Sequence, residues 1–168
     1  MRPVVLALLS VVLLSACGFS PVYGTRGSNV SGVEDALSLV SINRIPDREG
    51  QYLRNALIDR MHPNGSPVNA RYSLKIAAVT EQLVDLDITK DSDSTRAQLR
   101  LNTAMVLNDL QTGELVLSRR LSAVTSTNIL SSEFSTRVSE DNARLNALSE
   151  LARQAEQHLS LYFRQNDL

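Results

Sequence analysis

The segment RAQLRLNTAMVLND, residues 96–109, has the most regular hydropathy pattern in this 168-residue chain. Its polar positions include Arg96, Gln98, Arg100 and Asn102, and between them lie Ala97, Leu99, Leu101, Thr103, Met105 and Leu107. Successive side chains of a β-strand point to opposite faces of the sheet, so this alternation predicts a long strand with one buried and one solvent-facing side. The fold is therefore expected to contain a sheet that is covered on one face only.

Other segments supply partners for this strand. Residues 109–113 have the composition of a turn with a glycine at positive φ, and an apolar alternation over residues 115–121 continues in a strand that completes a hairpin. Residues 72–78 alternate as well, and a further strand over residues 36–46 ends at a proline, which cannot donate to a sheet. Arg119 occupies a position at which the alternation of residues 115–121 would place an apolar residue, which predicts an edge position or a bulge there.

Two helices are predicted from apolar residues that recur at intervals of three and four. The first spans residues 47–61 with Asp47 as its N-cap, and the second spans residues 139–165 with Ser139 as its N-cap. Each helix has one apolar stripe, so both are expected to cover the apolar side of the sheet. The predicted fold class is α+β: a two-layer sandwich with a mixed sheet of about four strands and two helices on one face, in the order β-α-β-β-β-α.

Composition limits the classes of function. With 43% hydrophobic and 21% charged residues, the chain can bury a core in a single domain. Its 17 basic and 18 acidic residues give a formal charge of −1, so we expect no nucleic-acid partner. An anionic ligand would have to be bound by a local basic patch.

The N-terminus has the three parts of an export signal. Arg2 supplies a positive charge, residues 4–14 are almost entirely apolar, and Ser15 and Ala16 are small residues before a cleavage site. The apolar run is shorter than the ~20 residues that a transmembrane helix needs. We therefore expect residues 1–16 to be removed on export.

Cys17 is the only cysteine, so it has no partner for a disulfide within the chain. The tetrad Leu14-Ser15-Ala16-Cys17 resembles a bacterial lipobox, in which the thiol is linked to a diacylglycerol before the signal is cut off. Such a lipoprotein carries three fatty chains, palmitate among them, and two or more chains anchor a protein stably. The next positions are Gly18 and Phe19 rather than an aspartate, which in the enterobacterial sorting rule implies the outer membrane. The alternative is an ordinary signal peptide with a coincidental cysteine.

No catalytic or metal-binding motif stands out. The chain has no G-x-S-x-G, P-loop or G-x-G-x-x-G pattern, and its two histidines, His62 and His158, fall on different predicted helices. The acidic run Asp85, Asp87, Asp91 and Asp93 lacks the glycine and glutamate of an EF-hand loop, which favours a solvated hairpin end. We therefore expect no enzyme activity, no cofactor and no metal site.

One group of residues suits the binding of an anion. If the alternation holds, four basic side chains point to the polar face of the sheet, opposite the helices: Lys75, Arg96, Arg100 and Arg120. Guanidinium groups bind phosphate or carboxylate through bidentate hydrogen bonds. The alternative is a sheet face that is merely solvated.

Two stretches of the chain have a distinctive sequence: Cys17-Gly18-Phe19-Ser20-Pro21-Val22-Tyr23-Gly24, and a C-terminal set of Phe134, Val138-Ser139-Glu140-Asp141-Asn142-Ala143, a leucine and alanine helix, and Leu161-Tyr162-Phe163. Together they resemble the lipopolysaccharide (LPS) assembly lipoprotein family LptE, especially its alphaproteobacterial members. The predicted order of strands and helices is similar too. The resemblance spans most of the mature chain, and its middle part matches in pattern only.

This resemblance implies a non-enzymatic protein that is lipid-anchored in the outer membrane on its periplasmic side. It would sit in the lumen of the LptD β-barrel translocon as a plug and assembly partner while LPS passes to the outer leaflet. The basic sheet face would then have a ligand, because lipid A carries phosphates. The expected organisation is a lipoprotein signal peptide at 1–16, an acylated N-terminus and tether at 17–35, and an LptE-like α+β domain at 36–168.

Two other function classes stay open. The first is a general periplasmic lipoprotein adapter that binds another envelope complex through the same sheet, which co-purification with an outer-membrane barrel would argue against. The second is a membrane-tethered hydrolase, which a polar cleft with convergent serine, histidine and aspartate side chains would favour.

Overall fold

The sheet is organised around β4 (Arg96–Asp109), the strand predicted from the alternating segment. The computed structural model describes residues 28–85, 96–128 and 132–166. β5 (Leu115–Asn128) pairs antiparallel with β4 along one edge, and both β2 (Tyr72–Ile76) and β3 (Thr80–Asp85) pair antiparallel with it along the other. β1 (Val40–Ile42) pairs in parallel with β2, which makes the sheet mixed.

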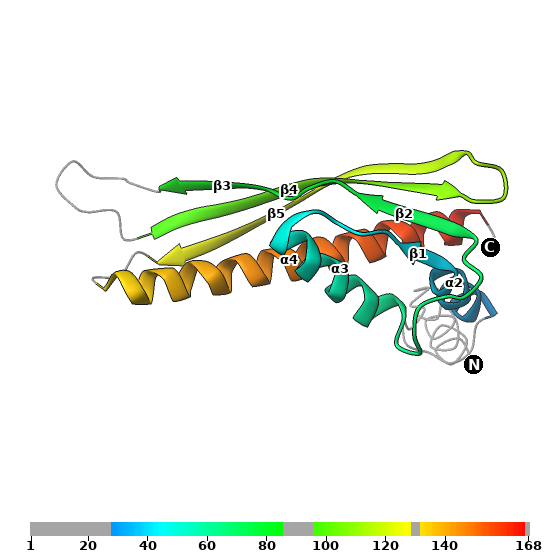
Figure 1. The fold of residues 1–168 in the computed structure, drawn as a ribbon, viewed down its shortest axis with the longest axis horizontal. Helices are drawn as coiled ribbons and strands as arrows, with labels where there is room; N and C mark the ends of the chain where they lie inside the picture. The colour runs from blue at the N-terminus through cyan, green and yellow to red at the C-terminus, as the bar shows by residue number, and fades with distance from the viewer. Residues whose placement is uncertain (1–27, 86–95, 129–131, 167–168) are drawn as a thin grey trace, which may run out of the picture.

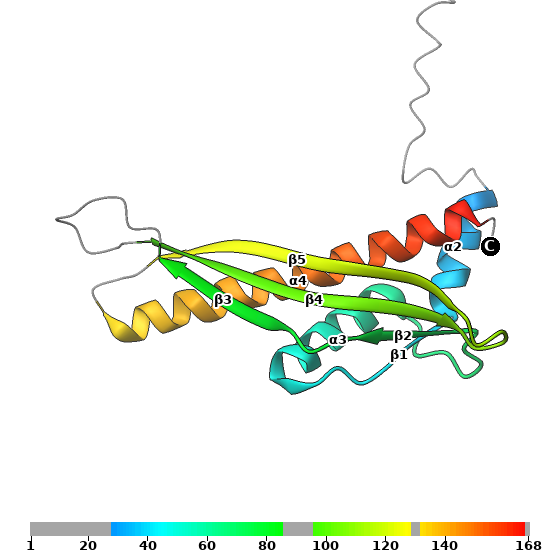
Figure 2. The ribbon, with the colours of Figure 1, turned by 90° about the horizontal axis from the view of Figure 1, so that it is seen from above.

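Three helices cover one face of this sheet. They are α2 (Ser28–Ser38), α3 (Asp47–Met61) and α4 (Glu133–Gln165), and all three lie below β3, β4 and β5 in Figure 1. Seen from above, α4 runs beneath β4 and β5 along most of the length of the molecule (Figure 2). The expected α+β two-layer sandwich is therefore confirmed, with five strands and three helices in place of about four and two.

The core lies between β4 and α4. Leu99, Leu101, Met105 and Leu107 are inaccessible to solvent, and they share one cluster with the buried stripe of α4. That stripe consists of Ala143, Ala147, Leu148, Leu151, Ala152, Ala155, Leu159 and Phe163. Its four alanines present little side-chain bulk, which lets a helix lie close to a sheet, and the larger residues fill the remaining space.

The first part of the domain differs from the prediction. The alternation predicts a strand over residues 36–46, but α2 continues to Ser38 and β1 has only three residues. No helix is predicted upstream of residue 47, yet Val33, Ala36 and Leu37 of α2 are buried in the core, so α2 extends across the boundary expected at residue 36.

Three further differences concern single elements. β3 is an additional strand that continues the line of β2 along β4. Asp47 does not cap α3: it is the first helical residue, with φ of 64°, and Pro46 precedes it at the N-cap. α4 begins at Glu133 instead of Ser139, and the Ser139 hydroxyl lies 2.9 Å from that of Thr127 on β5.

An ion pair ties the edge strand β3 to α4. Arg144 donates two hydrogen bonds to the carboxylate of Glu81, from Nε at 2.7 Å and from Nη2 at 2.8 Å. Hydrogen bonding from Arg144 holds the pKa of the Glu81 carboxyl below its ordinary value, and it raises the pKa of the guanidinium in return. The ionised form of Glu81 is therefore favoured by folding.

We predict that Glu81→Gln lowers stability at pH 7 by at most about 1 kcal/mol, because the pair is partly solvent-exposed. A carboxyl whose pKa is depressed by folding contributes stability above its unfolded pKa and loses that contribution as the pH falls through the folded pKa. The difference between wild type and Glu81→Gln should therefore shrink as the pH falls below the unfolded pKa of the carboxyl, and it should vanish once Glu81 is protonated in the folded protein, as measured by urea unfolding. Glu114→Gln, at an exposed position of the β4–β5 turn, is the control and should show no such pH-dependent difference.

We also predict that Gly50→Ala destabilises the domain by about 1–3 kcal/mol. A Cβ at residue 50 of α3 would lie 2.7 Å from Cγ2 and 3.0 Å from the carbonyl carbon of the buried Ile45. In an open helical position the same change would stabilise the helix by up to about 1 kcal/mol. A loss of stability would therefore support the close contact of residue 50 with Ile45, and a gain would contradict it. Asn55→Ala, an exposed position of the same helix, is the matched control, and thermal or urea unfolding measures both.

Candidate functional site

The outer face of the sheet is the surface on which the four predicted basic residues lie. Directly paired residues share a face, so Arg120, opposite Ala104, and Lys75, opposite Val106, point to the same side as Arg96 and Arg100. All four side chains are exposed. The other face of the same strands is the buried one that packs on α4.

The outer face bears no carboxylate among its described strand positions. Besides the four cations, its residues are neutral: Ser41, Ser73, Thr80, Gln82, Val84, Gln98, Asn102, Ala104, Val106, Asn108, Ser118, Ser122, Val124, Ser126 and Asn128. A surface that is only solvated usually mixes charges of both signs. This face is uniformly basic although the whole chain has a formal charge of −1.

The cations form a line and do not converge. Arg96 and Arg100 are four residues apart on β4, and Arg120 lies beside position 104, so each step is about 14 Å at about 3.4 Å per residue. Lys75, beside position 106, ends the line on the other edge of β4. The whole stripe is thus about 34 Å long. It suits a ligand with several separated anionic groups better than a single phosphate.

Neutral hydrogen-bonding groups flank these cations. Gln82 on β3 lies directly opposite Arg100, and Asn102 lies between Thr80 on one side and Ser122 on the other. Amides and hydroxyls can donate to phosphate oxygens or to sugar hydroxyls between the charged positions. Whether the four cations act as ligands of an anion stays a prediction.

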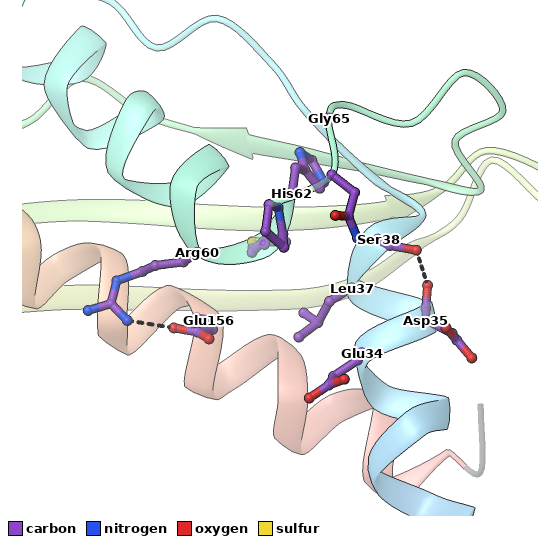
Figure 3. A pocket seen from close by; sticks show the side chains of 11 residues that line it. Glu34, Asp35, Leu37, Ser38, Arg60, His62, Gly65 and Glu156 are labelled. Atoms are coloured by element: carbon purple, nitrogen blue, oxygen red, sulfur yellow. Dashed lines mark hydrogen bonds and ion pairs between the residues drawn. The ribbon is translucent and has the colours of Figure 1, made fainter.

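A pocket of about 450 Å³ lies on the helical layer (Figure 3). Glu34 lines it from α2, His62 from the residue that follows α3, and Glu156 from α4, where it accepts a hydrogen bond from Arg60 at 2.9 Å. His62 is buried, and in the described part of the chain neither of its ring nitrogens has a hydrogen-bond partner. The sequence shows no local spacing that would link these residues, because only the packing of three helices brings them together.

The same pocket holds a serine and an aspartate. Ser38 and Asp35 line it, but the Ser38 hydroxyl donates to the main-chain carbonyl oxygen of Asp35 at 2.6 Å. In the residues that the structure covers, no hydrogen bond joins a serine to His62, which is the contact that activates a serine nucleophile. The convergent arrangement that would favour the hydrolase alternative is not seen here.

Several sequence predictions fall outside the described residues. They are the signal peptide at 1–16, Cys17 with the first part of the tether, and the acidic positions 87, 91 and 93. Within residues 28–85, 96–128 and 132–166, no three His, Cys, Asp or Glu side chains gather where they could hold a metal ion. None of the helices in these ranges combines the length and the apolar character that crossing a bilayer would require.

The fold is shared with solved bacterial lipoproteins. A candidate lipoprotein from Caulobacter crescentus is 26% identical, with 80% of this chain and 97% of that chain covered and a TM-score of 0.65. A minor lipoprotein from Acinetobacter baumannii is 22% identical over 73% of this chain and 90% of its own, with a TM-score of 0.59. The rare lipoprotein B from Shewanella oneidensis is 9% identical over 76% and 95%, with a TM-score of 0.54. No model of a protein family matches the sequence, and no curated protein matches it.

Proposed function

We propose that this chain is an outer-membrane lipoprotein that partners and plugs the LptD β-barrel during LPS assembly. The resemblance of both chain ends to the LptE family supports this role, and so does a fold shared with proteins described as lipoproteins. The observation that carries the proposal is the outer sheet face, which has four cations, no described carboxylate and no covering helix.

The anchor and the body have separate tasks in this proposal. Fatty chains on Cys17 hold the N-terminus at the inner leaflet of the outer membrane, and stable anchoring needs at least two such chains. The body extends from that point as a sandwich whose main helix has 33 residues, about 50 Å at 1.5 Å per residue. A wide β-barrel encloses an aqueous lumen, which an elongated body with a polar outer face can fill without an apolar interface.

The basic stripe faces the LPS in this arrangement. Lipid A presents separated phosphates, and the guanidinium groups of Arg100 and Arg120 can bind two of them through charge-assisted hydrogen bonds. Since Arg100 and Arg120 are separated by about 14 Å along the strand, they are expected to contact different phosphates. The neutral amides and hydroxyls between them match sugar hydroxyls.

We predict that Arg100→Glu with Arg120→Glu weakens binding of purified LPS at least about tenfold, because each lost charge-assisted hydrogen bond is worth about 1.5–3 kcal/mol. Binding is measured by fluorescence titration in detergent. Arg137→Glu with Arg153→Glu, on exposed turns of α4, makes the same change in net charge on the helical layer and is the matched control. Equal LPS affinity of both double variants would mean that the sheet face is only solvated.

We further predict that Cys17→Ser abolishes attachment of fatty chains and leaves the fold intact, since residue 17 precedes the described domain. Intact-mass spectrometry of protein from the membrane fraction should show wild type starting at a triacylated Cys17 and the variant without lipid. Affinity purification from detergent extracts then tests the barrel: wild type should retain an LptD-type protein. Recovery of another envelope complex in its place would favour the adapter alternative.

A further inference from the structure

The pocket beside His62 is separate from the basic sheet face, because it lies on the helical layer. Its volume of about 450 Å³ falls in the range of small-ligand sites, roughly 300–1,000 Å³. Figure 3 shows Glu34 and Leu37 projecting from α2 toward α4, with His62 above them and the pair of Arg60 and Glu156 opposite. The neighbouring helices α2 and α3 and the distant helix α4 thus form its walls.

The His62 ring is held in place without partners for its own polar atoms. The main-chain N–H of His62 donates to the carbonyl of Ile58 at 2.8 Å, and its carbonyl accepts from the N–H of Gly65 at 3.0 Å. These two bonds fix the residue at the end of α3, and the whole residue is only 5% exposed. Both ring nitrogens lack a hydrogen-bond partner among the described residues, which is unfavourable for a buried polar group. A ligand that pairs with them regains that free energy, and it reaches them only when the ring or a neighbouring side chain moves, because neither nitrogen is accessible in this structure.

The charges around the pocket select a cation. Glu156 is neutralised by Arg60, whose Nη1 lies 2.9 Å from its carboxylate. Glu34 lines the same pocket with an exposed carboxylate that forms no ion pair with another described residue, whereas the side chain of Asp35 points away from His62 (Figure 3). The pocket therefore has one uncompensated negative charge, which attracts positive groups and repels phosphate or carboxylate.

The apolar part of the lining requires that the ligand also has a hydrocarbon portion. Leu37, Met61 and Pro63 provide hydrocarbon surface next to the polar groups. A side chain of the lysine type buries an alkyl stem along such a surface and keeps its charged end among polar partners. A neutral imidazole has one acceptor nitrogen for an ammonium N–H and one N–H for a carbonyl or hydroxyl oxygen of the same ligand.

We propose that this pocket binds a primary alkylammonium group, with His62 accepting a hydrogen bond from the ammonium and Glu34 supplying the compensating charge. The group can belong to a lysine of a partner polypeptide or to a free diamine, since both present the same alkyl stem and ammonium. The proposal does not depend on LPS or on the barrel, because none of the four basic sheet residues lines the pocket.

The histidine rings give a direct readout. The chain has only two histidines, so the ¹⁵N-labelled protein in detergent shows two ring systems, and His158→Gln assigns them. Titration with n-butylammonium should shift the ring nitrogens of His62 saturably and leave those of His158 unchanged. Two further titrations distinguish the sources of the ammonium group. One uses lysine with blocked α-amino and α-carboxyl groups, and its tighter binding indicates a polypeptide partner. The other uses putrescine, and its tighter binding indicates a free diamine.

Variants test the assigned roles. Glu34→Gln should weaken n-butylammonium binding about two- to fivefold, as expected for an exposed ion pair, and Asp59→Asn, an exposed acid of α3 outside the pocket, should leave it unchanged. His62→Leu should abolish binding and raise the melting temperature, because it removes two unpartnered buried nitrogens. The proposal is overturned if His62 shows no saturable shift, if Glu34→Gln binds as tightly as wild type, or if acetate shifts His62 in place of the amines.

Discussion

The pairing of β4 with three other strands is the constraint on which the rest of the structure depends. Its alternate residues Leu99, Leu101, Met105 and Leu107 are all inaccessible to solvent, and each is held in register by β5 on one edge and by β2 or β3 on the other. A shift of one residue in any of these pairings would turn the buried set outward and Arg100 inward. The burial of four large side chains therefore also sets the direction of the basic stripe.

The placement of all helices on one side follows from the same asymmetry. α4 is attached to β5 by polar contacts as well as by the core: Thr125 donates to the main-chain carbonyl of Ala143 at 3.1 Å, and Thr127 contacts Ser139. These contacts lie on the inner face of β5. Since the three helices bury the apolar side, none of them covers the outer face, which the proposed ligand requires.

Much of the fold can be predicted from the sequence, and the exceptions have physical reasons. The apolar residues of β4 recur at every second position and those of α3 at intervals of three and four, so each segment predicts one type of element. The sequence does not predict β3, because Leu83 and Val84 are adjacent, point to opposite faces and are both about half exposed, so hydropathy does not alternate along this edge strand. Ser139 has the residue type of an N-cap and therefore predicts too late a start for α4, whereas it lies inside the helix and contacts β5. The basic stripe follows from alternation, whereas the His62 pocket needs a tertiary arrangement that no periodicity encodes.

The hairpin of β4 and β5 leaves one long side without a neighbouring strand among the described residues. An open edge of 14 residues is a template for pairing with a second molecule and hence for aggregation. Arg119 lies in its middle, opposite Met105 on the helix-facing side, and its guanidinium donates to the carbonyl of Ser118 at 2.8 Å. Charged residues that point to the inner side of an edge strand are one way in which natural sheets disfavour edge-to-edge pairing, and the position of Arg119 fits that pattern.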